Sequence, residues 1–288
     1  MKCNTKKVIP VSQPQIDKDW RDAMSVYDRY LVGLNDTFFY CPEHSHACYG
    51  CSSTILNPQD VFEISKSLSL PMVDFIKKYC DCYIGPMSKV PLIALKRTGK
   101  NEKCIFRKGG QCIIKDMKPT MCRLHPLGRV IHLADSNGTT KVEYINPNKM
   151  RVCMCGLGKR YTVQDWLRKN NLDDNTFPIK WTETIQYLNE KVSYYKTIFT
   201  KESTWNALYN VIYSFMYMSY NPDEEFMPQF LNNIERLNES FKTIEDIYQL
   251  YSNQHAQKRM LRANKKMIPK GSKFKIKKID VKEVRKRT

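Results

Sequence analysis

Apolar side chains in the second half of the chain recur every three or four residues, the period that places them on one face of an α-helix. This part, residues 177–251, contains no cysteine and no glycine. The pattern predicts three or four helices joined by short connections. The apolar runs are Trp181, Ile185, Leu188, Val192, Tyr195 and Phe199, then Trp205, Leu208, Ile212 and Phe215, then Phe230, Ile234, Leu237 and Phe241.

A row of tyrosines, Tyr209, Tyr213 and Tyr217, lies in the same half at intervals of four residues. Such a row can form a stacking platform for a ligand. On an apolar helix, however, it more often packs in a core or an interface. We therefore expect these rings to be packed.

The first half has shorter apolar runs, separated by turn residues. A helix start is expected at 57–60, where Asn57 can cap the helix, Pro58 fits its first turn and Asp60 follows closely. A second short helix is expected directly after Pro71. The predicted buried faces are Val61, Ile64 and Leu68 for the first helix, and Met72, Phe75, Ile76 and Tyr79 for the second.

Turn signals also predict a β-hairpin further along the chain. Gly109 and Gly110 lie between two short apolar runs, which is typical of such a turn. The hairpin would bring Cys104 and Cys112 to the same end of a two-stranded ribbon. Pro119 would then end regular structure, so that Cys122 approaches from a loop.

These patterns together predict an irregular α+β fold. We expect a small Cys-rich metal-binding domain with short helices and a β-hairpin, followed by an α-helical segment and a basic tail. The four segments are 1–36, 37–172, 176–252 and 253–288. The first is expected to be an arm with one amphipathic helix, because Trp20, Met24, Tyr27 and Leu31 recur at helical spacing.

Composition narrows the class of protein. The chain has 288 residues, 42% of them hydrophobic, and it has no apolar run near the roughly 20 residues that cross a bilayer. We therefore expect no transmembrane segment. The first ten residues lack the apolar stretch of a secretory signal, so we expect a cytoplasmic location. The 11 cysteines are too few for a disulfide scaffold, and in a reducing compartment they are more often metal ligands or buried thiols.

Charge is concentrated at the end of the chain. Residues 258–288 carry fourteen Lys and Arg against Asp280 and Glu283, which is two thirds of the net charge of +18. We expect this tail to be mobile or weakly helical, because it has little apolar surface to bury. It can contact nucleic acid, ribosomes or an anionic membrane surface, or it can be a solvated tail without a partner.

Eight cysteines form three turn-rich clusters that can converge on a metal. Thiolates two residues apart can turn around one ion, and soft thiolates select zinc or an iron–sulfur cluster without distinguishing between them. Cys80, Cys82, His44, His46 and His125 are weaker candidates. The predicted ligands are Cys41, Cys48 and Cys51, then Cys104, Cys112 and Cys122, then Cys153 and Cys155.

The ordered motifs around these cysteines resemble the bacterial cysteine-cluster proteins of the YkgJ type. The resemblance covers about residues 38–170 and implies a domain that chelates zinc or iron. Lys118 stands where the family has arginine, and Ser52 stands where it has a further cysteine. The motifs are Phe39-Tyr40-Cys41, Cys48-Tyr49-Gly50-Cys51, Pro58-Gln59-Asp60, Cys104-Ile105-Phe106, Gly109-Gly110-Gln111-Cys112-Ile113, Lys118-Pro119, Cys122-Arg123, Cys155-Gly156-Leu157-Gly158-Lys159, Tyr161-Thr162-Val163 and Trp166-Leu167.

The same domain occurs in flagellin lysine methylases. That resemblance implies, as an alternative, an iron–sulfur protein lysine N-methylase that uses S-adenosylmethionine. The chain has no recognisable glycine-rich loop for this cofactor, and no residue stands out as a catalytic base. The sequence therefore leaves open whether the protein is an enzyme, and a nucleic-acid- or ribosome-associated module that uses the tail is a further alternative.

Overall fold

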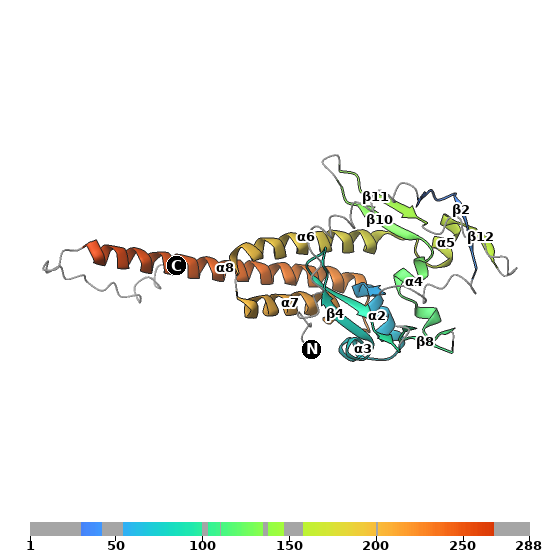
Figure 1. The fold of residues 1–288 in the computed structure, drawn as a ribbon, viewed down its shortest axis with the longest axis horizontal. Helices are drawn as coiled ribbons and strands as arrows, with labels where there is room; N and C mark the ends of the chain where they lie inside the picture. The colour runs from blue at the N-terminus through green and yellow to red at the C-terminus, as the bar shows by residue number, and fades with distance from the viewer. Residues whose placement is uncertain are drawn as a thin grey trace. The chain divides into compact units, whose positions relative to one another are not determined.

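The protein is a mixture of helices and small antiparallel sheets (Figure 1). The computed structural model describes residues 30–41, 54–99, 103–109, 111–134, 138–146, 158–199 and 201–267. Contacts divide the chain into two compact units, Met1–Leu237 and Asn238–Thr288. The α+β class predicted from the sequence is confirmed, and every described strand belongs to the first unit.

One layer of the first unit is a three-stranded antiparallel sheet in the order β3-β5-β4. Cys80 is the first residue of β4, and it pairs with Leu95 of β5. Because alternate residues of a strand face the same side, Cys80, Cys82 and Ile84 point together into the core. The strands are β3 (Ile55–Leu56), β4 (Cys80–Ile84) and β5 (Pro91–Leu95).

Two helices connect the strands of this sheet, α2 (Pro58–Ser67) and α3 (Met72–Tyr79). Helix α2 begins with a capping box, in which Asn57 accepts the amide N–H of Asp60 and Asp60 accepts that of Asn57. The expected start of this helix is confirmed. The predicted faces are also buried, except that Leu68 and Tyr79 are only partly so.

A second core lies around α5 (Val163–Lys169) and two further sheets. One sheet has the order β1-β11-β10, and the other pairs β2 with β12. The strands are β1 (Leu31–Val32), β2 (Thr37–Tyr40), β10 (Gly128–His132), β11 (Lys141–Ile145) and β12 (Lys159–Thr162). Leu31, expected on a helix, lies in β1, and the other three residues of that predicted face are outside the described residues.

The segment that follows β5 and precedes β10 in the sequence consists of very short elements. The hairpin at Gly109 is confirmed, because β8 and β9 pair there and Gly109 has a positive φ of 54°. Cys104 was expected in the same ribbon as Cys112, but it lies in β7, which pairs with β6. The elements are β6 (Arg97–Thr98), β7 (Lys103–Cys104), β8 (Arg107–Lys108), β9 (Gln111–Cys112), the 3-10 helix η2 (Lys115–Met117) and α4 (Thr120–Leu124).

Three long helices follow, as the apolar period predicts. They are α6 (Thr176–Ile198), α7 (Glu202–Tyr217) and α8 (Phe226–Met267). The tyrosine row on α7 is buried, so the expectation that it packs is confirmed. Within the first unit, α6 packs against α7 through Trp181 and Tyr217, whose ring centroids are 6.2 Å apart. It packs against α8 through Phe177 and Phe230, whose ring centroids are 5.2 Å apart.

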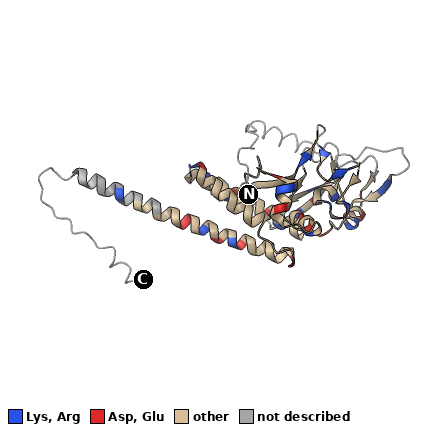
Figure 2. Ribbon diagram, turned by 90° about the horizontal axis from the view of Figure 1, so that it is seen from below, with Lys and Arg blue, Asp and Glu red and all other residues tan. Residues whose placement is uncertain are grey.

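Helix α8 continues into the second unit and ends at Met267, inside the stretch assigned from the sequence to the basic tail. Acidic and basic residues are interspersed in its part from 235 to 246 (Figure 2). None of the described helices is both long enough and apolar enough to cross a membrane.

Candidate functional site

Three of the predicted metal ligands lie in the segment of short elements. Cys104 is in β7, Cys112 is in β9 and Cys122 is in α4, and each side chain is half-buried. Cys122 was expected in a loop. It lies in helix α4 because Pro119 begins this helix and does not end regular structure. A proline fits a helix start, where its nitrogen needs no hydrogen-bond partner.

Cys41, the fourth described ligand candidate, is buried directly after β2. The register of the β2–β12 pair places Tyr40 opposite Lys159. The chain around Cys41 therefore lies beside the start of β12, which follows the third cysteine cluster in the sequence. Gly158 has a packing role here, since a Cβ at this position would stand 1.8 Å from the ring of Phe39.

Trp166 of α5 joins this ribbon to α4. Its ring centroid lies 4.5 Å from that of Tyr40, and its buried indole N–H donates to the carbonyl of Leu124 at 3.2 Å. Tyr40 is the neighbour of Cys41, and Leu124 is two residues after Cys122. One indole thus contacts residues beside two predicted ligands that are 81 positions apart.

The two weaker cysteine candidates are now distinguishable. Burial raises the pKa of the Cys80 thiol far above its ordinary value, so this side chain remains a neutral thiol. Cys82 is disulfide-bonded and is therefore not a free thiol in this structure. Burial also lowers the pKa of His125, so its ring is neutral at physiological pH.

The described residues do not bring three Cys, His, Asp or Glu side chains together around one point. Cys48, Cys51, Cys153 and Cys155 lie outside the described residues, as do His44 and His46. The structure therefore gives positions for four of the eight predicted ligands, and metal binding by all eight stays a prediction.

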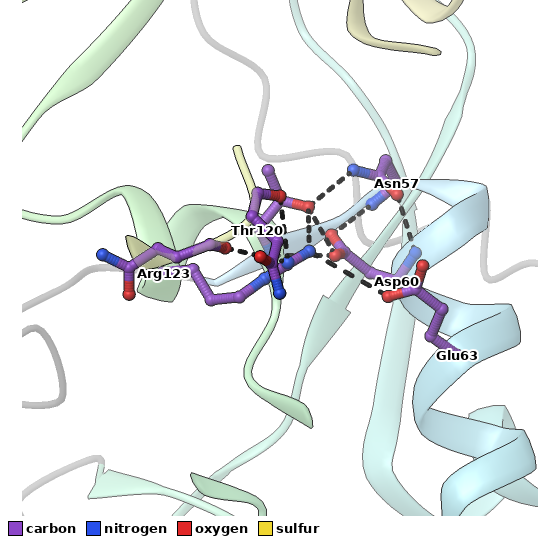
Figure 3. Close-up of polar contacts among 7 residues, drawn as sticks. Asn57, Asp60, Glu63, Thr120 and Arg123 are labelled. Atoms are coloured by element: carbon purple, nitrogen blue, oxygen red, sulfur yellow. Dashed lines mark hydrogen bonds and ion pairs between the residues drawn. The ribbon is translucent and has the colours of Figure 1, made fainter. Parts of the chain in front are cut away.

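A polar cluster that the sequence did not reveal connects α2 to α4 (Figure 3). Asp60 is 3% exposed and accepts the amide N–H and the hydroxyl of Thr120, both at 2.7 Å. Burial raises the pKa of Asp60 from 3.8 to about 6, although these hydrogen bonds and Arg123 oppose the shift. The sequence showed Asp60 only as part of a helix start, because its partner lies 60 residues away.

Fold and site together define a mixed α+β protein with a cysteine-bearing region of short elements between two small cores. Comparison with known proteins gives no narrower class. No family model matches the chain, and neither a curated protein nor a solved structure matches it.

Proposed function

We propose that the protein is a metal-binding cysteine-cluster protein, of the family that its motifs resemble, which holds zinc or an iron–sulfur cluster. The observation that carries the proposal is the contact of Trp166 with both Tyr40 and Leu124. A shared site needs ligands from distant segments to approach one another. Trp166 supports this because it holds together the flanks of Cys41 and Cys122.

The first cysteine cluster is also connected to α4 through β3. Helix α4 contacts β3, which begins four residues after Cys51. The hydrogen bonds from Thr120 to Asp60 hold α4 against the start of α2, directly after β3. These contacts support a site that the first and second clusters share.

The segment from 97 to 125 also needs a source of stability besides a core. Its described elements are strands of two residues and helices of three and five residues. Among its described side chains only four are buried, namely Phe106, Ile114, Pro119 and Leu124. A bound metal supplies such a region with folding free energy that apolar burial does not.

Substitution of Cys122 by serine tests the proposal. Serine removes the thiolate, so we expect Cys122→Ser to lose most of its zinc or iron when it is purified without oxygen. Elemental analysis and a visible absorption spectrum measure this, and brown colour with bound iron indicates a cluster whereas a colourless zinc protein excludes one.

The matched control is Cys80→Ala, which removes a thiol that burial keeps protonated. We expect this variant to keep its metal. Full retention of metal by Cys122→Ser contradicts the ligand assignment, and a wild-type protein without near-stoichiometric zinc or iron contradicts the proposed function.

A further inference from the structure

A cavity of about 400 Å³ lies among α2, α4, β10 and the start of α6, in the first unit. This volume is within the range of pockets that hold small molecules. Arg123 of α4 and Arg129 of β10 line it, and Leu172 and Phe177 give it an apolar wall. Figure 3 shows Arg123 and Glu63 beside the Asp60 cluster. The metal proposal does not use this cavity.

Both guanidinium groups are only partly compensated by their neighbours. Arg123 donates to the carbonyl of Asn170 at 3.2 Å, and its nearest carboxylate oxygen, on Glu63, is 3.9 Å away. Arg129 donates to the carbonyl of Leu172 and lies 5.8 Å from the ring centroid of Tyr144. Asp174 stabilises its charge electrostatically, but no described carboxylate is within ion-pair distance of it. The Nε atoms of both arginines are buried without a hydrogen-bond partner among the described residues. A partly buried guanidinium whose acceptors are mostly neutral is incompletely compensated, so an anion in the cavity would be favourable.

The rest of the lining restricts the charge of that anion. Lys118 adds a third cation, but Glu63, Asp116 and Asp174 also line the cavity. These carboxylates repel a dianion more strongly than a monoanion. Two planar guanidinium groups suit a carboxylate, because each can donate two parallel hydrogen bonds.

We propose that this cavity binds a small carboxylate with an apolar body, with its carboxylate on Arg123 and Arg129 and its body against Leu172 and Phe177. The probe that tests this is phenylacetate, which combines both features. Isothermal titration calorimetry on the full chain measures its affinity, and inorganic phosphate serves as the dianionic comparison.

We expect Arg129→Gln to weaken phenylacetate binding about tenfold or more, since it removes a charge-assisted hydrogen bond. Arg160→Gln in β12 is the matched control, because Arg160 is exposed and outside the cavity lining, and its affinity should equal that of the wild type. Equal binding to Arg129→Gln, no binding to the wild type, or tighter binding of phosphate overturns the proposal.

Glu63→Gln keeps the proposal testable if Arg129→Gln does not fold. It removes the carboxylate that competes for Arg123, so phenylacetate should bind several-fold more tightly than to the wild type. A purely structural role of these arginines predicts no such gain, and unchanged or weaker binding contradicts the proposal. Metal content measured on the same samples separates this result from the proposed metal function.

Discussion

At the scale of single residues, Asp60 lies in a buried environment that the sequence did not predict. It is buried, and its carboxyl accepts hydrogen bonds from Thr120 and from the amide of Asn57. Those bonds favour the ionised form, whereas burial disfavours it and prevails, so the pKa is about 6. The side chain that holds α2 to α4 therefore titrates just below neutral pH.

The raised pKa of Asp60 predicts a dependence of stability on pH. A carboxyl with a higher pKa in the folded than in the unfolded state stabilises the fold fully below the unfolded value, here 3.8. That contribution, about 3 kcal/mol, is lost as the pH rises through about 6. The free energy of unfolding of the wild type, minus that of Asp60→Asn, should fall by this amount over the interval.

Urea unfolding at a series of pH values measures the difference, and Asp223→Asn, at an exposed position, is the control. A difference between wild type and Asp60→Asn that stays constant with pH contradicts the assignment.

At the scale of elements, the structure depends on contacts between segments far apart in the chain. Trp166 is the clearest case, because its indole N–H is the buried donor to the carbonyl of Leu124, 42 residues earlier. Its ring also packs against Phe38 and Tyr40 of β2 and against Tyr161 of β12. Helix α5 thus connects a ribbon and α4 through one side chain.

Trp166→Phe tests that connection. Phenylalanine keeps most of the aromatic packing but removes the indole donor to the carbonyl of Leu124, which still accepts the amide N–H of Leu127 at 3.0 Å. The loss should therefore be that of one ordinary hydrogen bond, about 1 kcal/mol. Urea unfolding monitored by circular dichroism gives the change in the free energy of unfolding. Trp181→Phe in α6, where the ring packs on Tyr217 and Phe230, is the comparison, and an equal loss in both variants would argue that only aromatic area matters.

Elements set by neighbouring residues were predictable from the sequence. The cap at Asn57, the turn at Gly109 and the three long helices depend on residues a few positions apart, so their patterns are visible in one sequence. The pairing of Cys104 with Arg97 was not predictable, because two-residue strands carry no clear period.

The same reason limits prediction of the candidate site. The spacing of the cysteines predicts metal ligands, and the structure places Tyr40, beside Cys41, and Leu124, two residues after Cys122, against one indole. The bond between Asp60 and Thr120 and the cavity beside it depend on packing between distant segments. No local pattern encodes which distant partner a buried polar residue takes.

At the scale of the whole molecule, the distribution of charge differs between the first part of α8 and the chain from the end of that helix onward. From 235 to 246, α8 has Arg236 and Lys242 among four acidic residues (Figure 2). The excess of positive charge begins at Lys258. An anionic polymer would therefore be attracted to the last part of the chain.

Deletion of residues 258–288 tests a role for that charge. If the tail binds nucleic acid, the affinity of the full chain for a labelled duplex should fall steeply between about 50 mM and 200 mM salt, because bound cations are released from the duplex. Fluorescence anisotropy measures this. The deletion should remove both the binding and its salt dependence. Unchanged binding would show that residues 258–288 do not contact the duplex.

The pairing of β2 with β12 also determines the order in which the chain can fold during synthesis. Phe38 pairs with Tyr161, so the second strand leaves the ribosome more than 120 residues after the first. At ordinary rates of translation that is a delay on the order of ten seconds. During this delay Cys41 has been synthesised but the residues of β12 beside it have not. The same holds for β1, whose partner β11 is synthesised much later. A thiol with so long an interval before burial is exposed to the metals and oxidants of the cell before the fold can protect it.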